Sequence, residues 1–282
     1  MVGLITKGIA GFYYVRYETV VFQCKARGIF KKDGVTPAVG DYVEFEALDD
    51  EEGVINSVLP RQNHFIRPPV ANVDCFFIVV AAAQPQPNLL ILDKFLVTAE
   101  RAGIPSVICI NKMDLSTEEK LMMFETIYKA IYPILKISCV TGEGLNLMPD
   151  LIKGRKVALT GPSGVGKSTI INKLQDGLKL ATDSVSVKTK RGRHVTRHVE
   201  LFEADFGGMI FDTPGFTSFD AIGAESREIA CFYPEMIKYI GKCRFDDCMH
   251  LKEPDCAVLD AVRKGEIAAS RYESYRRQII GN

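Results

Sequence analysis

Five short apolar runs, rich in aromatic and β-branched residues, fill residues 1–68, and turn-forming sequences such as KKDG, AVGD and DDEEG separate them. Each run predicts a β-strand, and five strands in so short a segment predict a small barrel such as the OB-fold. A small sandwich or an SH3-like barrel would fit the same pattern. The consecutive prolines of RPPV (67–70) disfavour both a helix and a central strand, so we expect a linker there.

The pattern changes at residue 73, where continuous apolar runs begin to alternate with segments of helical spacing. A strongly apolar strand at 73–82 precedes a helical pattern at 88–103, and the strand at 105–111 precedes a second helical pattern at 116–132 that opens with Ser-Thr and two glutamates. PILKIS (133–138) and KVALTG (156–161) predict two further strands. Such alternation predicts a parallel α/β sheet that binds its ligand at the carboxyl ends of the strands.

The segment after residue 222 has helical patterns that a cysteine-rich stretch interrupts. We therefore expect three domains: an OB-fold-like β-barrel (1–68), an α/β domain (69–222) and a helical domain (223–282). The helical tail at 262–279 carries five basic residues against two acids. It could dock on RNA or pack on the α/β domain, and the sequence favours neither.

Composition narrows the class of protein. Of 282 residues 47% are hydrophobic and 25% are charged, which is typical of a soluble globular chain, and the formal net charge is zero. We find no signal peptide and no apolar run near the roughly 18 residues of a membrane span, so we expect a cytoplasmic protein without membrane contact. Separately, we expect a monomer. Basic runs at 25–32 and 188–198 are candidates for RNA or phosphate contact, although either could be an ordinary solvated surface.

A phosphate-binding loop follows the strand KVAL. GPSGVGKST fits G-x-x-x-x-G-K-[ST] and opens the helix STIINKL, which is the context that this motif requires. Its backbone N–H groups and the helix N-terminus favour an anion. Lys167 would contact the β- and γ-phosphates, and the Ser168 hydroxyl would be a ligand of Mg²⁺. The candidate nucleotide-binding residues of this loop are Gly161, Pro162, Ser163, Gly164, Val165, Gly166, Lys167, Ser168 and Thr169.

NKMD (Asn111, Lys112, Met113, Asp114) follows the strand SVICI and predicts a guanine-binding loop. The Asp114 carboxylate would accept hydrogen bonds from N1–H and the exocyclic amine of guanine, whereas adenine would leave a buried carboxylate unpaired. Asn111 would brace the loops, and the stem of Lys112 would lie on the purine face. SCVTGEG (138–144), with Ser138 and Cys139, resembles a loop whose backbone donors contact the guanine O6.

GGMIFDTPGF (207–216) is an apolar strand that ends in Asp-x-x-Gly. Asp212 would hold Mg²⁺ through water, and the Gly215 N–H would meet the γ-phosphate. The basic segment between the phosphate loop and this strand should contain the threonine that closes over Mg²⁺. We assign Thr196, with Thr189 as the second choice.

Four thiol and imidazole ligands lie within CRFDDCMHLKEPDC: Cys243, Cys248, His250 and Cys256. Three thiolates and one imidazole complete a tetrahedral structural zinc site with no position open for water. A disulfide with a spare thiol is the alternative, which a reducing compartment disfavours. The other five cysteines are scattered singly, mostly among apolar neighbours, as reduced core residues would be.

The base-reading loop precedes the phosphate loop here, which is the reverse of the ordinary order, so the sequence predicts a circular permutation. A parallel sheet tolerates it because its loops meet at one edge whatever their order in the chain. With GPSGVGKST, NKMD, DTPGF and the cysteine cluster, the chain resembles the RsgA (YjeQ/YloQ) family, bacterial circularly permuted GTPases that assist maturation of the small ribosomal subunit. The resemblance spans essentially the whole chain. It implies GTP hydrolysis stimulated by the small subunit, with rRNA as partner.

Phe216 occupies the position where many GTPases place a glutamine that orients the attacking water. Phenylalanine cannot hydrogen-bond water, so we expect slow turnover by the isolated protein. His194 is a candidate general base or RNA contact, and it could equally be a surface histidine with neither role. Two other functions fit less well: a binding module whose docking GTP controls and hydrolysis resets, and a metabolic P-loop kinase, against which Asp114 argues.

Overall fold

The computed structural model describes residues 1–27, 30, 35–179, 199–212 and 226–281. Two compact units share these residues. Unit 1 comprises Met1–Cys75, Asn146–Leu159 and Lys167–Phe216, and unit 2 comprises Phe76–Leu145, Thr160–Gly166 and Thr217–Asn282.

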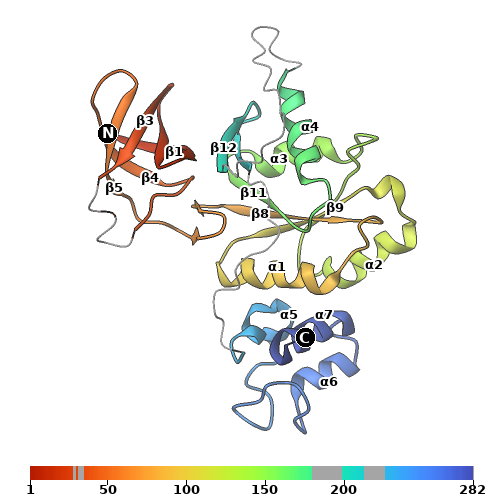
Figure 1. Ribbon diagram of the computed structural model, residues 1–282. Helices are drawn as coiled ribbons and strands as arrows, with labels where there is room; N and C mark the ends of the chain where they lie inside the picture. The colour runs from red at the N-terminus through yellow and green to blue at the C-terminus, as the bar shows by residue number, and fades with distance from the viewer. Residues whose placement is uncertain (28–29, 31–34, 180–198, 213–225, 282) are drawn as a thin grey trace. The chain divides into compact units, whose positions relative to one another are not determined.

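A closed five-stranded barrel forms the N-terminal part of unit 1 (Figure 1). Its strands follow the order β1-β2-β3-β5-β4, and β4 pairs back onto β1 to close it. The bounds are β1 Val2–Ile9, β2 Phe12–Tyr17, β3 Val20–Ala26, β4 Tyr42–Ala47 and β5 Glu52–Val58. Side chains of alternate residues fill the interior, and Ile5, Val15 and Ile55 are completely buried there. The closure shows a five-stranded barrel, as the OB-like prediction requires, and excludes the sandwich that the sequence also allowed.

A two-stranded ribbon of β6 (His64–Phe65) and β7 (Val70–Ala71) follows the barrel. The expectation of a plain linker at 67–70 is therefore wrong at its last residue, because Val70 belongs to a strand and is completely buried. The prolines themselves lie in the turn between the two strands.

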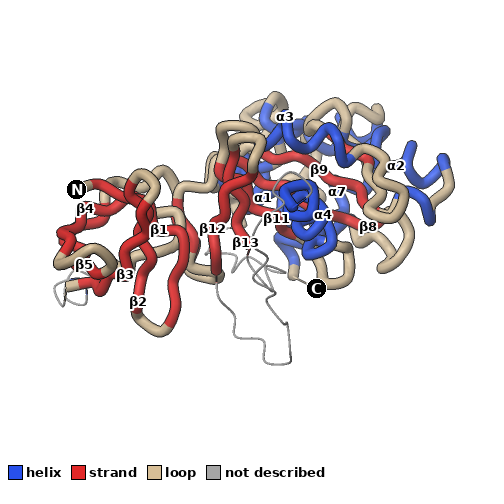
Figure 2. Tube along the Cα trace, turned by 90° about the horizontal axis from the view of Figure 1, so that it is seen from above, coloured by secondary structure: helices blue, strands red, loops and turns tan. Residues whose placement is uncertain are grey.

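The rest of unit 1 is a small α/β layer. Strands β11 (Lys156–Thr160) and β13 (Gly208–Asp212) run parallel, and β12 (Val199–Ala204) pairs antiparallel with β13. Helix α4 (Lys167–Lys179) packs against β12 and β13, and α3 (Met148–Ile152) follows η3 (Leu145–Leu147). The outer edge of β12 pairs with β1, so the barrel and this layer share one continuous run of strands (Figure 2). The sequence did not reveal β12 or α3.

Unit 2 contains a parallel three-stranded layer of order β10-β9-β8. Every residue of β8 (Cys75–Ala81) and β9 (Ser106–Asn111) is buried, as a sheet covered on both faces requires, and β10 (Ile134–Lys136) is shorter. Helix α1 (Leu89–Arg101) begins at Asn88, whose side chain accepts a hydrogen bond from the Ile91 N–H. Helix α2 (Glu118–Tyr128) follows Thr117, whose side chain makes no capping hydrogen bond.

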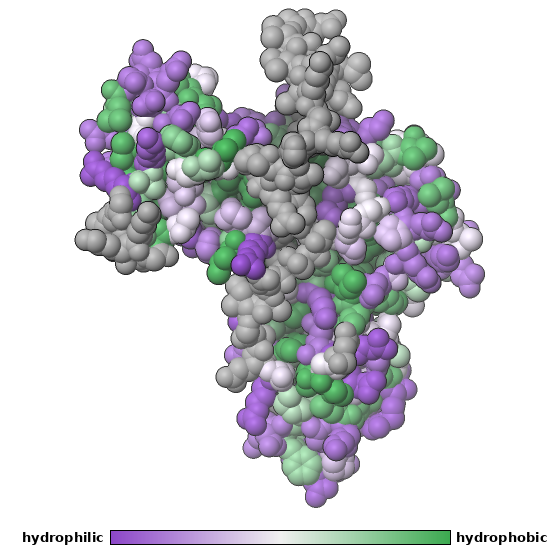
Figure 3. All heavy atoms as spheres, in the orientation of Figure 1, coloured by the Kyte–Doolittle hydropathy of each residue, from purple (hydrophilic) through white to green (hydrophobic). Residues whose placement is uncertain are grey.

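The C-terminal segment of unit 2 is helical and packs on α1, beside which α7 lies in Figure 1. The bounds are η4 Ile229–Phe232, α5 Pro234–Ile237, α6 Ala257–Arg263 and α7 Ala269–Ile280. The basic tail thus packs on a helix of the α/β region, one of the two alternatives. Hydrophobic and hydrophilic residues are intermingled on the face of this segment seen in Figure 3.

All eight cysteines are free, and Cys24, Cys75, Cys109 and Cys139 are buried as expected of core thiols. Cys231 is exposed, so it is not one of them. Among the described residues, no helix is both long and apolar enough to cross a membrane.

Candidate functional site

The carboxyl ends of β8 and β9 lie level in unit 2, because Ala81 and Asn111 are partners in register. The loops that leave these strands begin at one edge of the layer, where a parallel sheet binds its ligands. The NKMD residues lie in the loop after β9, in which η2 spans Met113–Leu115. The Met113 N–H donates to the carbonyl of Ile137, which ties this loop to the one that follows β10 (3.2 Å).

Asn111 joins the NKMD loop to the phosphate loop. Its side chain is 1% exposed, its Nδ2 donates to the Val165 carbonyl (2.8 Å), and its Oδ1 accepts from the Lys112 N–H (2.8 Å). Both ends of the amide are thus engaged, and each bond fixes a different loop. This is the bracing arrangement that the sequence predicted for Asn111.

Lys112 extends across the same region. Its backbone is left-handed (φ 62°), and its ammonium donates to the carbonyls of Gln84 (2.7 Å) and Gly164 (2.8 Å). Sequence reasoning did not include the Gln84 loop. Its only sequence signal is its place directly after a buried parallel strand, because a backbone carbonyl carries no side-chain signature.

Ser138 holds the Asp114 carboxylate. The Ser138 hydroxyl donates to Asp114 Oδ1 (2.5 Å) and accepts from the N–H groups of Val140 (3.2 Å) and Thr141 (3.1 Å). Ser138 is completely buried, and the neighbouring Cys139 is also buried. The exposed Asp114 carboxylate is thus oriented by a fixed hydroxyl, which lowers the entropic cost of aligning it with a ligand.

Two glycines of the phosphate loop stand where no other residue would fit. A Cβ on Gly161 (φ +137°) would lie 2.1 Å from the Val79 carbonyl oxygen, and a Cβ on Gly166 (φ +100°) would lie 2.3 Å from Asn111 Nδ2. Gly164 also has a positive φ, of 80°. The close approaches and left-handed backbone explain why the motif needs glycine at its first and sixth positions.

Helix α4 begins at Lys167, directly after the glycines. Burial lowers the pKa of the Lys167 ammonium to about 8. A phosphate group beside this side chain would favour its charged form, because an opposite charge raises the pKa of an amine.

Ser168 and Asp212 offer oxygen ligands of the kind that Mg²⁺ prefers. Ser168 lies in the first turn of α4, and α4 packs on β13, whose last residue is Asp212. Because Ala158 and Phe211 are register partners, Asp212 lies at the carboxyl end of β11, from which the chain enters the phosphate loop. The two residues therefore fit the metal that the phosphate-loop motif implies.

Several predicted residues lie outside the described part of the chain. They are Thr189, His194, Thr196, Gly215 and Phe216.

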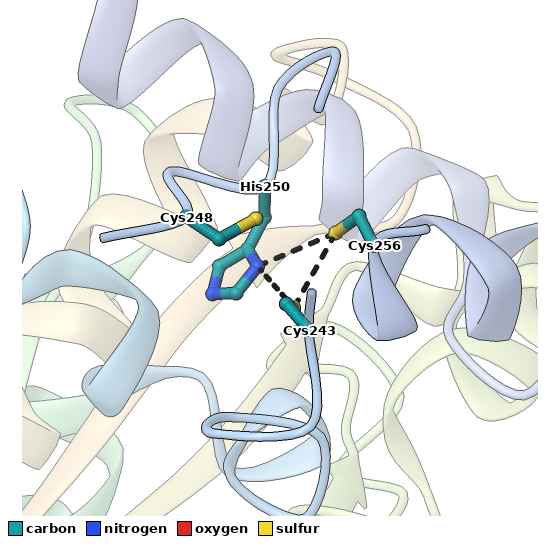
Figure 4. A group of neighbouring side chains, drawn as sticks. All are labelled: Cys243, Cys248, His250 and Cys256. Atoms are coloured by element: carbon teal, nitrogen blue, oxygen red, sulfur yellow. Dashed lines mark hydrogen bonds between the residues drawn. The ribbon is translucent and has the colours of Figure 1, made fainter. Parts of the chain in front are cut away.

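The predicted zinc ligands Cys243, Cys248, His250 and Cys256 converge in the C-terminal segment (Figure 4), with ligand atoms all within 4.8 Å of one another. Cys243 Sγ and Cys256 Sγ are 3.8 Å apart, and each lies 3.4 Å from His250 Nδ1. Bonds of about 2.3 Å to sulfur and 2.0 Å to nitrogen place tetrahedral ligands about 3.8 Å (S–S) and 3.5 Å (S–N) apart. Cys243, His250 and Cys256 therefore have the spacing of ligands in a tetrahedral metal site, and Cys248 Sγ lies within 4.8 Å of their ligand atoms.

The backbone around these ligands is fixed by Glu253 and two tyrosines. The Glu253 carboxylate accepts from the N–H groups of Met249 (2.9 Å), Leu251 (2.8 Å) and Lys252 (2.9 Å). Tyr272 and Tyr275 of α7 donate to the carbonyls of His250 (2.9 Å) and Met249 (2.8 Å). The cluster is thus attached to the last helix, which itself packs on α1.

Comparison with known proteins gives one consistent result. A family model described as the RsgA GTPase matches residues 58–222, and one described as the RsgA N-terminal domain matches residues 2–55. A relative from Caldanaerobacter subterraneus subsp. tengcongensis is 45% identical over 97% of this chain and 92% of its own length. A second relative, from Ruminiclostridium cellulolyticum, is 43% identical over 97% of this chain and 91% of its own length. Both are named small ribosomal subunit biogenesis GTPase RsgA.

Two solved structures resemble the whole chain. YjeQ from Thermotoga maritima matches with a TM-score of 0.85 and 36% identity, covering 100% of this chain and 99% of that one. YloQ, described as a circularly permuted GTPase, matches with a TM-score of 0.81 and 36% identity over 99% and 93%. The permuted order predicted from the two loops is confirmed. The chain belongs to the RsgA GTPase family, as a circularly permuted P-loop GTPase with an N-terminal β-barrel and a C-terminal helical region that carries a Cys3His cluster.

Proposed function

We propose that this GTPase is an assembly factor that binds the small ribosomal subunit, assists its late maturation, and hydrolyses GTP faster when the subunit is bound. The observation that carries the proposal is the similarity over nearly the whole chain to relatives named for small-subunit biogenesis. The geometry supports the nucleotide part, because Asn111 joins the base-reading loop to the phosphate loop.

Base selection in this proposal belongs to Asp114. Its two carboxylate oxygens accept from the N1–H and the exocyclic amine of guanine, while Ser138 holds the side chain in place. Adenine offers no pair of donors at these positions, so binding it would leave a desolvated carboxylate unpaired. The Lys112 stem covers the purine face, and backbone N–H groups around Cys139 contact O6.

Phosphate binding belongs to the N–H groups of residues 161–169 and to the Lys167 ammonium. Ser168 and Asp212 hold Mg²⁺, the serine directly and the aspartate through water. A cation held by these residues would supply positive charge beside the phosphate oxygens. For hydrolysis we assign the Gly215 N–H to the γ-phosphate, Thr196 to closure over the metal, and His194 to a general-base or RNA-contacting role.

Hydrolysis by the protein alone is expected to be slow, because Phe216 replaces the residue that would orient water. The small subunit then completes the catalytic arrangement or supplies a group to it. Fast turnover of GTP by the isolated protein would contradict this role of Phe216.

The Cys3His cluster holds one structural zinc ion in this proposal. Burial raises the pKa of the Cys248 thiol to about 12, and a bound dication is what releases such a proton near neutral pH. Replacing Cys248 with serine should remove the zinc and unfold the C-terminal helices while nucleotide binding survives. Zinc content equal to that of the wild type, measured by atomic absorption, would refute the assignment.

We propose rRNA as the direct contact, reached from the cytoplasm by a monomer whose domains are 1–68, 69–222 and 223–282. Because the net charge is zero, binding must depend on local basic surfaces and on RNA shape. The two basic runs at 25–32 and 188–198 are the sequence basis for this contact. The whole of the second run, and residues 28–29 and 31–32 of the first, lie outside the described residues.

The experiment is a GTPase assay with the full chain alone, with purified small subunits and with large subunits. Stimulation by small subunits alone is expected, and equal rates in all three would refute the proposal. Release of the protein from small subunits should also be compared between GTP and a non-hydrolysable analogue. Release only with GTP supports an enzyme that acts by hydrolysis, and equal release supports a module gated by nucleotide binding.

A further inference from the structure

A single row of cross-strand neighbours connects the barrel to the predicted magnesium ligand. Lys7 of β1 is directly opposite Glu200 of β12, and Glu200 is directly opposite Asp212 of β13. Residues that are opposite one another on antiparallel strands point to the same face, with Cβ atoms about 4.5–5.5 Å apart. All three side chains therefore lie in one line on one face of the sheet.

This row contains one repulsive pair, Glu200 and Asp212, and one attractive pair, Lys7 and Glu200. Glu200 and Asp212 are like charges on directly opposed positions, an arrangement that is destabilising unless another charge offsets it. Lys7 provides that charge, because its Nζ lies 3.2 Å from Glu200 Oε2. The two side chains are 32% and 49% exposed, so the ion pair adds little to stability but still changes the local electrostatic potential.

We infer that Lys7 and Glu200 are positioning residues that set the strength of magnesium binding at Asp212. The Glu200 carboxylate adds negative potential beside Asp212, and the Lys7 ammonium partly cancels it. Because Lys7 belongs to β1 of the barrel, the potential at the metal-holding aspartate depends on where the barrel strand lies. The inference rests on the proposed role of Asp212 in holding Mg²⁺.

A second ion pair on the same strand supplies a matched control. Glu203 of β12 pairs with Arg16 of β2, another barrel residue, and is 60% exposed. Glu203 is three positions from Glu200, so it points to the opposite face of the sheet, and its partner in register is Met209 rather than Asp212. Removing this charge tests any general effect of weakening the contact between the barrel and β12.

The experiment titrates Mg²⁺ into the full-length protein bound to a fluorescent, non-hydrolysable GTP analogue at low ionic strength. Glu200→Gln should weaken Mg²⁺ binding about threefold, and Lys7→Met should strengthen it about twofold, as expected for partly exposed charges in a high effective dielectric. Lys7→Arg should match the wild type, and so should Glu203→Gln. High salt should shrink both shifts, because it screens exposed charges.

The decisive result is a change of Mg²⁺ affinity in opposite directions for Glu200→Gln and Lys7→Met. If the two residues had only a structural role, both variants would change the affinity in the same direction. Shifts of the same sign, no shift, or an equal shift in Glu203→Gln would overturn the inference. The variant Asp212→Asn distinguishes failure of this inference from failure of the proposed magnesium site. If Asp212→Asn weakens Mg²⁺ binding strongly while the Lys7 and Glu200 variants bind Mg²⁺ as the wild type does, only the inference fails. If it has no effect, the proposed magnesium site fails, and the inference with it.

Discussion

Arg271 of α7 is the side chain whose removal we expect to damage the fold of unit 2 most. Its guanidinium is completely buried, donates to Asp93 Oδ1 of α1 (2.6 Å), and binds both oxygens of Glu235 of α5 (2.6 and 3.1 Å). It also stacks on the Tyr233 ring, 4.5 Å from the centroid. Burial alone would lower the pKa of Arg271, but these carboxylates raise it well above its ordinary value, so the group stays charged.

The expected loss of stability in Arg271→Met follows from the burial of Arg271, Asp93 and Glu235. Asp93 is 0% exposed and Glu235 is 8% exposed, so Arg271→Met leaves two desolvated carboxylates close together without their cation. Removing one member of a buried pair costs about 3–5 kcal/mol. A loss of this size should separate α7 from α1, because Arg271 makes the charged contact between them.

Two measurements test this: urea unfolding gives the free energy of unfolding, and hydrogen exchange of the α7 amides reports whether α7 separates from α1. Arg276→Met is the matched control: this residue is on the same helix and pairs with Glu273, but its side chain is 46% exposed, so a change below about 1 kcal/mol is expected. Combining Arg271→Met with Asp93→Asn and Glu235→Gln should recover more than half of the loss, since no buried charge remains unpaired. If Arg271→Met changed stability no more than Arg276→Met, the reasoning would be refuted.

Two further predictions concern the nucleotide loops and the Cys3His region. Gly166→Ala should weaken GTP binding at least tenfold in a fluorescence titration, because its Cβ would lie 2.3 Å from Asn111 Nδ2 on a left-handed backbone; unchanged affinity would show that the two loops are not held together as described. Burial would raise the pKa of Glu253, but its backbone N–H donors outweigh burial and lower the pKa from 4.5 to about 2. Its stabilising contribution should therefore be complete above pH 4.5 and disappear as the pH falls toward 2, and a carboxyl NMR titration with a midpoint near 4.5 would contradict this.

The elements that could be predicted from sequence are those whose signal is local. The five barrel strands, the phosphate loop and the four clustered ligands each occupy one continuous stretch with its own pattern. Gly161 and Gly166 could be assigned because their motif states a backbone requirement, which the structure shows as contacts that exclude a Cβ.

The features that were missed depend on partners far away in the chain. In the sequence Arg271 is one of several basic residues in a polar tail. Its buried partners Asp93 and Glu235 lie 178 and 36 residues earlier in the chain. Strand β12 is held between β1 and β13, and the sequence before it is dominated by basic residues rather than by strand-forming ones. The Gln84 carbonyl binds Lys112 through its backbone, which no residue pattern encodes.

The most direct measurement is nucleotide preference in Asp114→Asn. An asparagine amide presents one donor and one acceptor instead of two acceptors, so it matches xanthine, whose ring has a carbonyl where guanine has its amine. Competition binding should show wild-type protein preferring GTP over both ATP and xanthosine triphosphate, and the variant preferring xanthosine triphosphate over GTP. If the variant kept its preference for guanine, Asp114 would not be the residue that reads the base.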